Sequence, residues 1–435
     1  MKKVLIISYY FPPSGGAGVQ RVLKFVKYLP QFGWEPVVLT ADENADFPAR
    51  DSTLLSEIPE GVRVVRTRIF EPYRLYRKLT GKAEGEALDI ATNTRESRRG
   101  LGEKASEWVR STFFIPDARR FWTGPAVRAG REILKSDKID LIFSSAPPYT
   151  CHLIGKELKR ASHLPWVADF RDSWVGWLSA PKRSFLPHQI DLQLEGSVLS
   201  KADCLIAVSD GVRDDLVSRH ADAGSGKWAT IPNGFDEDDF KGISAKTDPN
   251  RFVLTYAGTL YGKRNPFVLL EALKGLLSER PGLRDRLLLR FVGRADAAFV
   301  KAFGTFGRTV EFIPYVSHRE SLQFLADSSA LLLIIDDAPA SRSIVTGKLF
   351  EYVGARKPIF ALAPDGAAAY LVRSLDAGVV VHPNDMVEIK RALGRLVEQW
   401  EQKSLHYPAD AGKARQYERK HLTRELAGLF DKLVQ

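Results

Sequence analysis

Short apolar runs alternate with amphipathic stretches along most of the chain, and this alternation is typical of an α/β protein. Val4–Tyr9 is an apolar run that predicts a buried strand, and a stretch rich in proline and glycine follows it. Val19–Leu29 then places apolar side chains at helical spacing, and Glu35–Thr40 is a second strand-like run. The chain therefore opens with a β-α-β unit of a parallel sheet.

The same alternation returns near residue 139 and continues to the C-terminus. Further strands are predicted at Ile139–Ser144, Trp166–Phe170, Cys204–Val208, Phe252–Tyr256, Leu287–Val292, Val310–Ile313, Ala330–Ile335, Ile359–Leu362 and Val379–Val381. Helices are predicted at His152–Ala161, Pro187–Ser200, Met386–Trp400 and Ala411–Val434. A further helix is predicted from an N-cap at Ser209 or Asp210 to about His220. A chain of 435 residues is too long for one ordinary core, which predicts two domains. We expect them at 1–240 and 241–410, with a linker reaching about Asn250 and a C-terminal helical segment at 411–435.

Bulk properties exclude several classes of protein. An apolar content of 44% and a charged content of 27% are typical of a soluble globular chain, and no apolar run approaches the roughly 20 residues of a membrane span. The opening MKKVLIISYYFPP has no small-residue cleavage site and predicts a strand rather than a signal peptide. Cys151 and Cys204 have no nearby ligand partners, so we expect neither a disulfide framework nor a zinc site. We expect a cytoplasmic protein.

The chain has a net charge of +10, and the stretch 66–82 contains six basic residues against one acid. Residues 70–135 fit the β-α pattern poorly and mix basic with aromatic side chains, as in Tyr73-Arg74 and Tyr76-Arg77-Lys78. We interpret this segment as an insertion that contacts a membrane surface, and a plain solvated helical face remains the alternative. Nucleic acid is not expected as a partner, because no nucleic-acid fold signature accompanies the charge.

Glycine-rich turns follow the first strand of each predicted domain. Gly15 and Gly16 stand between a strand and a helix, a layout that lets backbone N–H groups approach a phosphate. A dinucleotide fingerprint would need a third glycine where Arg21 stands, so a dehydrogenase that uses Asp42 as its ribose acid is a weaker alternative, as is a plain tight turn.

The second glycine turn is Gly258-Thr259-Leu260-Tyr261-Gly262, followed by two basic residues, Lys263 and Arg264. Both side chains have the reach to hold a diphosphate beside a helix N-terminus.

The stretch VTGKLFEYVGARKPIFAL predicts a helix followed by a short strand. Lys348 and Glu351 are three residues apart and therefore share one helix face, while Leu349 belongs to its apolar side. A lysine for phosphate and a carboxylate for hydroxyl groups suit a phosphorylated ligand that carries a sugar. An ordinary surface ion pair is the alternative.

A cluster of charged residues lies at another predicted strand end. Arg171 and Asp172 directly follow the strand Trp166–Phe170, and parallel sheets bind ligands beyond the carboxyl ends of their strands. We interpret the pair as part of a site, and an internal salt bridge is the alternative.

Taken together in their order, these motifs resemble the glycosyltransferases of the GT-B fold, close to the group 1 family (family four) and its relatives in bacterial surface-polysaccharide synthesis. The segments that carry the resemblance are PPSGGAGVQR, VADFRDSW, ADCLIAVSDGVRDDL, TIPNGFDEDDF, YAGTLYGKRNPFVLLEAL and VTGKLFEYVGARKPIFAL. The resemblance implies two Rossmann-like domains facing across a cleft, with C-terminal helices that cross back to the first domain.

The resemblance also implies roles for individual residues of the donor site. Glu351 matches the glutamate that holds the ribose of the donor, and Arg264 falls where the family has a lysine that binds the diphosphate. Thr259 stands where many members have a second basic residue, for which Lys263 could substitute. Lys348 matches the basic residue of a "K-x-x-E-Y" variant.

The first domain is expected to contribute two further pairs of residues. Gly15 and Gly16 match the loop that closes over the phosphates. Arg171 and Asp172 match positions near the transferred sugar. One departure is Ser343, because many members carry a second glutamate at that position, and that acid faces the transferred sugar.

The implied reaction is transfer of a sugar from a nucleoside diphosphate sugar to a hydroxyl group, with retention at the anomeric carbon. Neither a metal nor a cofactor is expected, and UDP is expected before GDP as the nucleotide. The acceptor would be a lipid-linked or polysaccharide precursor at the inner face of the cell membrane. A nucleotide-sugar epimerase of the same fold and an inactive membrane-peripheral scaffold are the alternatives.

Overall fold

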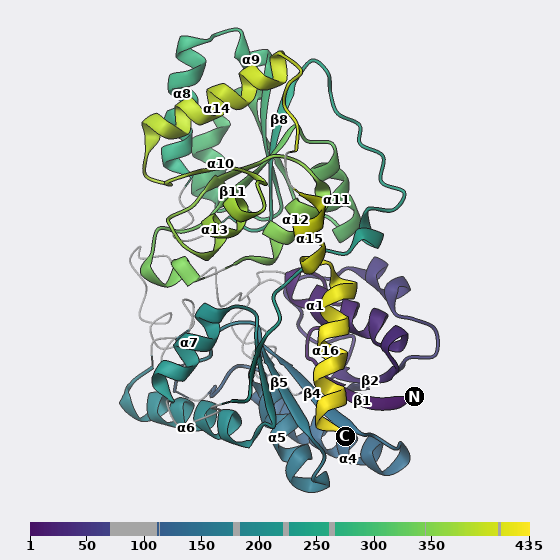
Figure 1. Cartoon of the computed structure of the whole chain (residues 1–435). Coiled ribbons are helices and arrows are strands. Elements are labelled where there is room, and N and C mark those ends of the chain that lie inside the picture. Colours follow the sequence, from purple (N-terminus) through teal and green to yellow (C-terminus); the bar gives the residue numbers. More distant parts are fainter. Residues whose placement is uncertain are drawn as a thin grey trace. The chain divides into compact units, whose positions relative to one another are not determined.

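A computed structural model describes residues 1–69, 111–112, 114–176, 183–220, 226–260, 266–343, 345–407 and 410–435. Lys263, Arg264 and the greater part of the predicted insertion lie outside these ranges. The described chain forms two compact units (Figure 1). The first comprises Met1–Pro232 and Arg419–Gln435, and the second comprises Asn233–Glu418. The chain thus crosses between the units at residue 232, where the sequence predicts a boundary at 240, and again at 418.

The first unit is built on a parallel sheet whose strand order is β3-β2-β1-β4-β5-β6-β7. Its strands are β1 (Lys2–Ile7), β2 (Trp34–Ala41), β3 (Arg63–Thr67), β4 (Leu141–Ala146), β5 (Trp166–Phe170), β6 (Cys204–Ala207) and β7 (Trp228–Thr230). Its helices are α1 (Ala17–Tyr28), α4 (Thr123–Ser136), α5 (Thr150–Ser162), α6 (Phe185–Lys201), α7 (Asp210–Arg219) and α16 (Arg419–Leu433), with 3-10 turns η1 (Leu29–Phe32), η2 (Ser52–Glu57) and η3 (Arg120–Trp122).

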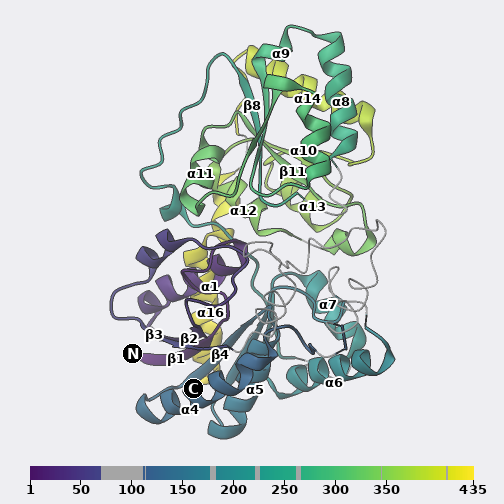
Figure 2. The ribbon, with the colours of Figure 1, turned by 180° about the vertical axis from the view of Figure 1, so that it is seen from behind.

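Helices cover both faces of this sheet. Helices α4, α5 and α6 pack on one face, and α1 and α16 pack on the other (Figures 1 and 2). Helix α1 buries Val19, Val22 and Val26 at helical spacing, and Leu23 and Phe25 are fully buried as well. Phe430 of α16 contacts Trp34 edge to face, with ring centroids 5.3 Å apart. The predicted return of the C-terminal helix to the first domain is thus confirmed.

The second unit contains a parallel sheet of strand order β10-β9-β8-β11-β12-β13. Its strands are β8 (Phe252–Ala257), β9 (Leu287–Val292), β10 (Val310–Ile313), β11 (Ala330–Ile334), β12 (Ile359–Leu362) and β13 (Gly378–Val381). Its helices are α8 (Phe267–Glu279), α9 (Leu283–Arg286), α10 (Ala297–Gly304), α11 (His318–Ala326), α12 (Gly347–Ala355), α13 (Ala367–Ser374), α14 (Met386–Glu401) and α15 (Ala411–Ala414), with 3-10 turns η4 (Glu237–Phe240), η5 (Gly307–Thr309), η6 (Pro339–Ser343) and η7 (Arg415–Tyr417). Helices α8, α10 and α14 pack on one face, and α11, α12 and α13 pack on the other.

Two strands and one helix of the first unit were not predicted. β3 and β7 are edge strands with partly exposed side chains, so they lack the continuous apolar run that marks a central strand. Helix α4 lies inside the segment interpreted as an insertion, yet it buries Ala126, Gly130 and Ile133 and belongs to the helical layer. Its arginine-rich outer side obscured this short buried stripe. That interpretation is therefore corrected for residues 123–135.

The acidic segment after the first crossing is a second correction. Asp236 lies in the segment predicted as a linker, but it is only 2% exposed. Its carboxylate accepts a hydrogen bond from the backbone N–H of Asp238, 3.0 Å away, and so caps η4. Phe240 of η4 packs against the core of the second unit. Within the described ranges, no helix is both long and apolar enough to cross a membrane.

Candidate functional site

The strand order of the second sheet changes direction between β8 and β11. Connections from these two strands leave toward opposite faces, and such a switch point is where open parallel sheets bind ligands. Gly258 follows β8, and the chain after β11 leads through η6 into α12. The predicted donor residues Gly258, Thr259, Lys348 and Glu351 therefore occupy the carboxyl edge of the sheet at the switch point and the helix beside it.

Lys348 lies against the end of β8. Its Nζ donates a hydrogen bond to the hydroxyl of Tyr256 over 2.8 Å and lies 4.1 Å from the centre of the Tyr256 ring. The Tyr256 hydroxyl in turn donates to the carbonyl of Thr259 over 3.0 Å. A side chain at Gly258 would place its Cβ 2.6 Å from Lys348 Nζ. Lysine, aromatic ring and glycine loop thus form one packed group.

The glycines at this edge have a geometric reason. Gly258 has φ +125° and Gly293, at the end of β9, has φ +124°. A Cβ on Gly293 would lie 2.6 Å from the carbonyl oxygen of Gly258, so the two turns stack closely backbone on backbone. Glycine at both positions is therefore what allows this close approach.

Glu351 has a partner that the sequence did not indicate. Its Oε1 lies 3.3 Å from Nε2 of His318, the first residue of α11. Helix α11 begins with a capping box between Ser317 and Glu320, which fixes the start of the helix and with it His318. The pair links the carboxylate expected to hold a ribose to the neighbouring helix.

Leu349 and Tyr352 anchor α12 to the sheet. Leu349 is fully buried in the core, and its N–H donates to the carbonyl of Thr346 over 3.1 Å. The Tyr352 hydroxyl accepts a hydrogen bond from the N–H of Ala257 (2.9 Å) and donates to the carbonyl of Leu332 (3.1 Å). Because helix α12 is fixed to both strands of the switch point, Lys348 and Glu351 are held by a rigid support.

In the first unit, the switch point lies between β1 and β4. Gly15 and Gly16 connect β1 to α1, and Gly16 has φ +87°, which a glycine adopts without strain. The N–H of Gly15 donates to the carbonyl of Ala49 over 2.9 Å. The hydroxyl of Ser14 and the amide oxygen of Gln20 are buried and have no hydrogen-bond partner among the described residues. One hydroxyl group and one amide oxygen beside this loop therefore form no hydrogen bond with the described part of the unit.

Arg171 binds backbone rather than a carboxylate. Its guanidinium donates to the carbonyls of Gly18, Ala146 and Pro147. It thus joins the first turn of α1 to the end of β4, across the switch point. The arrangement is not the internal salt bridge of the alternative interpretation, because two of the three hydrogen bonds go to Ala146 at the end of β4 and to Pro147 after it, and one goes to Gly18.

Asp172 has a different environment. Burial raises the pKa of its carboxyl to about 6, although the neighbouring Arg171 opposes the shift. The carboxylate accepts no hydrogen bond from the described residues, whereas the backbone carbonyl accepts one from Tyr149 (3.3 Å). A carboxyl group that ionises near neutral pH at a strand end can exchange protons or bind hydroxyl groups.

Arg21 forms a buried ion pair that sequence reasoning missed. Its Nη2 lies 2.7 Å from Oδ1 of Asp169, and the two side chains are 1% and 0% exposed. Burial alone would raise the pKa of Asp169, but Arg21, a hydrogen bond from Ser145 and Arg171 outweigh it and lower that pKa. The residue in the place of a third fingerprint glycine therefore has a role in the core.

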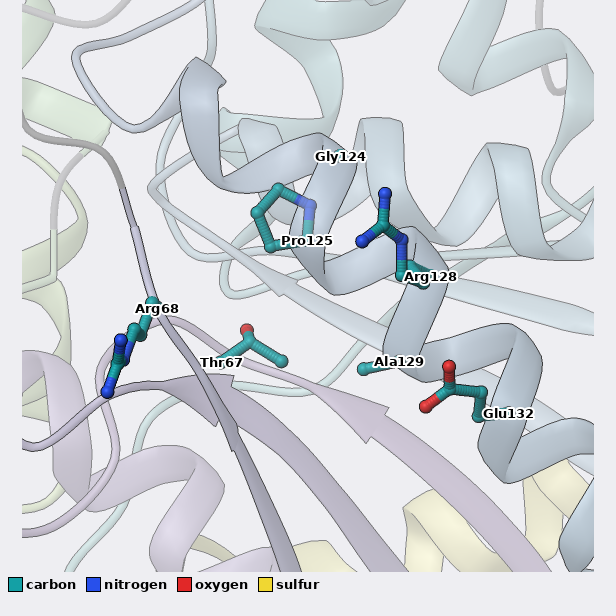
Figure 3. Close-up of a pocket in the computed structure, with 7 residues that line it drawn as sticks. All are labelled: Thr67, Arg68, Gly124, Pro125, Arg128, Ala129 and Glu132. Carbon is teal, nitrogen blue, oxygen red and sulfur yellow. The ribbon is translucent and has the colours of Figure 1, made fainter.

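Two cavities lie elsewhere in the first unit, along α4. One has a volume of about 430 Å³ and is lined by Thr67, Arg68, Gly124, Pro125, Arg128, Ala129 and Glu132 (Figure 3). None of the predicted site residues lines it. Arg68 and Arg128 come from different sides of the cavity and do not converge on one point. Across the described ranges, no three His, Cys, Asp or Glu side chains group as metal ligands would.

The fold and the two switch points define a class of protein: a two-unit α/β protein with a candidate ligand-binding edge in each unit. Residues 15–234, half of the 435 residues, match the glycosyl transferase 4-like domain family. The chain therefore belongs to this glycosyltransferase family.

Individual relatives agree with this assignment. The chain is 28% identical over 227 residues to a D-inositol 3-phosphate glycosyltransferase of Nocardioides sp., which covers 47% of this chain and 48% of the relative. It is 24% identical over 312 residues to the protein of that name from Actinosynnema mirum, which covers 67% and 63%. The chain thus matches only about half to two thirds of the length of these relatives.

Among solved structures, HepE of Anabaena in complex with UDP and glucose is similar, with a TM-score of 0.63 at 15% identity. The match covers 99% of this chain and 100% of that one. At this identity the likeness shows the fold, and it confirms the expected GT-B class of two Rossmann-like units.

Proposed function

We propose that the protein is a glycosyltransferase that moves a sugar from a nucleoside diphosphate sugar to a hydroxyl group. The observation that carries this proposal is the placement of Lys348 and Glu351 one turn apart on α12, at the switch point of the second sheet. Lys348 is held by Tyr256 against the glycine turn, and Glu351 is held by His318. A cation near a glycine loop and a carboxylate one turn away suit a diphosphate and a ribose of one ligand.

The departing diphosphate gains negative charge in the transition state. Lys348 and the positive end of the α12 helix dipole supply positive charge there, so the proposal includes no metal ion. Lys263 and Arg264 are proposed to complete the diphosphate contact, together with Gly258 and Thr259. We infer UDP as the nucleotide before GDP, and the HepE complex with UDP and glucose supports that order.

In the first unit, Asp172 is proposed to face the transferred sugar. Its raised pKa keeps part of the carboxyl group protonated near pH 6, so it can donate or accept a hydrogen bond at a sugar hydroxyl. Arg171 is proposed to act through the loop that it holds, in which Gly15 and Gly16 approach the phosphates. Retention at the anomeric carbon is part of the proposal, and its support is the family resemblance.

The acceptor is proposed to be a lipid-linked or polysaccharide precursor, bound by the first unit at the inner face of the cell membrane. The basic composition of residues 70–122 supports an anionic acceptor or membrane surface. The relatives named for D-inositol 3-phosphate support an acceptor that carries negative charge.

A thermal-shift experiment tests the donor site first. Purified protein is heated with UDP, GDP and their sugar conjugates, because a ligand that binds only the folded state raises the Tm. We expect a shift with UDP that Glu351→Ala abolishes. Glu401→Ala is the matched control, since Glu401 is 23% exposed against 25% for Glu351 and pairs with arginines at the far end of α14. Equal shifts in both variants would contradict the assignment of Glu351.

A second experiment separates transfer from the alternatives. UDP release from the bound sugar nucleotide is measured with and without a mixed lipid fraction as acceptor. Release that depends on the acceptor supports transfer. Conversion of the sugar nucleotide without acceptor would indicate an epimerase, and failure to bind any nucleotide would indicate a scaffold.

A further inference from the structure

The guanidinium of Arg21 makes more contacts than its ion pair requires. Nε and Nη2 contact the carboxylate of Asp169 at 2.9 and 2.7 Å. The remaining donors reach the carbonyls of Ile231 (Nη2, 2.9 Å) and Pro232 (Nη1, 2.8 Å). These are the last two residues of the first unit before the chain crosses to the second.

Arg21 is also close in sequence to the glycine loop of the first unit. Arg21 lies on α1, one turn after the helix begins at Ala17, and the helix directly follows Gly15 and Gly16 in the chain. Asp169 also accepts a hydrogen bond from Ser145 of β4 over 2.7 Å, and so fixes Arg21 relative to both central strands. Apart from the partly buried bond to the Pro232 carbonyl, the hydrogen bonds of this cluster are buried, so a shift of α1 would disturb the carbonyls at the crossing as well.

The two chain segments that follow and precede the crossings pair with each other in the second unit. Within the second unit, the N–H of Phe235 donates to the carbonyl of Tyr417 over 3.1 Å, and Phe235 forms a parallel bridge with Glu418. The two crossings of the chain, at 232 and 418, are thus connected only a few residues after Arg21 holds the first of them. The carbonyl groups of Ile231 and Pro232 therefore link this crossing to Arg21 of α1.

We propose that Arg21 is a positioning residue that couples the glycine loop of the first unit to the point where the chain leaves that unit. Rearrangement at the crossing then moves the loop that approaches the phosphates, and binding at the loop stiffens the crossing. The kinetic part of this inference rests on the proposed glycosyl transfer, whereas the mechanical coupling does not.

A double variant separates coupling from plain stability. Arg21→Met alone would leave the Asp169 carboxylate buried without its cation, and such a change is strongly destabilising. Arg21→Met combined with Asp169→Asn is neutral and fills a similar volume, so it is expected to fold. It still removes both donors to Ile231 and Pro232.

The matched control is Arg183→Met combined with Asp191→Asn in the same unit. Arg183 and Asp191 are 3% and 8% exposed, their Nε–Oδ2 distance is 2.7 Å, and Arg183 likewise donates to backbone carbonyls, those of Ser111, Phe114 and Pro116. Among the described residues, no hydrogen bond or ion pair joins this pair to α1 or to residues 231–232, so it reports the general cost of losing a buried pair.

Hydrogen exchange followed by mass spectrometry is the main measurement, because it needs no substrate. In the Arg21 double variant, amides of residues 14–22 and of residues 231–236 are both expected to exchange about tenfold faster, while the rest of the unit stays as in wild type. UDP is expected to slow exchange at 231–236 in wild type and in the Arg183 control but not in the Arg21 double variant. In transfer assays, kcat should fall with little change in the KM of the donor.

Unchanged exchange at either stretch in a folded Arg21 double variant would overturn the inference, as would equal effects in the Arg183 control. A protein that shows the exchange pattern but no transfer would support the coupling and contradict the proposed function instead.

Discussion

The ammonium group of Lys348 lies 2.8 Å from the hydroxyl oxygen of Tyr256 and 4.1 Å from the centre of its ring, although the two residues are 92 positions apart. The ring and the hydroxyl together fix the charge at the carboxyl end of β8. A lysine side chain on its own has four rotatable bonds, so this support reduces the entropy lost when an anion binds.

Tyr256→Phe tests that support. The substitution keeps the ring but removes the acceptor for Lys348 and the donor to Thr259. We expect a loss of about 1 kcal/mol in the free energy of unfolding, together with weaker UDP binding in calorimetry. Tyr407→Phe is the control, because the Tyr407 hydroxyl donates a long hydrogen bond, over 3.4 Å, to the carbonyl of Val353 toward the end of α12, away from Lys348 at its start. UDP affinity equal to wild type in Tyr256→Phe would show that Lys348 needs no such support.

Gly258→Ala tests the close approach of the lysine to the glycine turn. The new methyl group would lie 2.6 Å from Lys348 Nζ, and φ +125° is unfavourable for alanine. The flexible lysine can move away, so we expect a stability loss of roughly 1–3 kcal/mol from the backbone, with a reduced thermal shift by UDP. Gly304→Ala, where a Cβ would meet nothing within 4 Å, should leave both quantities close to wild type. Equal tolerance at the two positions would contradict the packed arrangement.

Asp172→Asn tests the buried carboxyl group in the first unit. Its pKa is raised from 3.8 to about 6, so the folded state binds the proton more tightly than the unfolded chain does. The free energy of unfolding of the wild type should therefore fall as pH rises from about 4 to beyond 6. The Asn variant lacks this loss and should be more stable than wild type at pH 7.5 by about 1–3 kcal/mol, with no advantage at pH 4.

Urea unfolding at both pH values measures this difference. Asp365→Asn is the control, because the Asp365 side chain is 89% exposed and its environment resembles that of the unfolded chain. An Asn variant that is less stable than wild type at pH 7.5 would indicate that the carboxylate makes a favourable contact. If Asp172 faces the sugar, the same variant should lose most of its kcat despite its greater stability.

His152 gives the opposite pH dependence. It is fully buried against Phe170 and Trp166, its Nδ1 lies 2.9 Å from the hydroxyl of Ser144, and its Nε2 has no partner among the described residues. Burial lowers its pKa from 6.5 to about 3. The unfolded chain therefore binds more protons between these values, and stability is lost as pH falls from about 6.5 toward 3.

His152→Gln should reduce the loss of unfolding free energy between pH 6.5 and pH 3 by about 2–4 kcal/mol. The same substitution should lower stability at pH 8, because a cavity replaces part of the ring. Circular dichroism during acid titration provides the measurement. The exposed His406 serves as a control position, and His406→Gln should leave the acid limb unchanged. An acid limb of wild-type steepness in His152→Gln would show that other groups control acid unfolding.

Much of the architecture could be predicted from the sequence. The central strands carry continuous apolar runs because both of their faces are buried, and the predicted bounds of β5, β9 and β12 agree with those observed. The predicted bounds of the edge strand β10 agree as well. Edge strands β3 and β7 lack that signal, and the arginines on the outer side of α4 hid its narrow buried stripe. The crossing at 232 could not be located, because the acidic segment after it has the composition of a linker yet buries Asp236.

The candidate site divides in the same way. Lys348 and Glu351 share a helix face, and a turn requires positive φ at Gly258 and at Gly16. Both features depend on only a few consecutive residues. By itself the sequence therefore determined the alternation of strands and helices, the two glycine turns and the pairing of charges on α12. The periodicities of helix and strand are local, so they can be found without knowledge of the fold.

Tertiary structure alone decided which distant groups meet. That Tyr256 holds Lys348, that His318 meets Glu351, and that Arg171 and Arg21 bind backbone carbonyls all follow from the order of strands in the two sheets. Strand order places β8 beside β11, and β1 beside β4, and no local pattern encodes it. It is fixed by the burial of both faces of each sheet at once, which is a property of the whole chain.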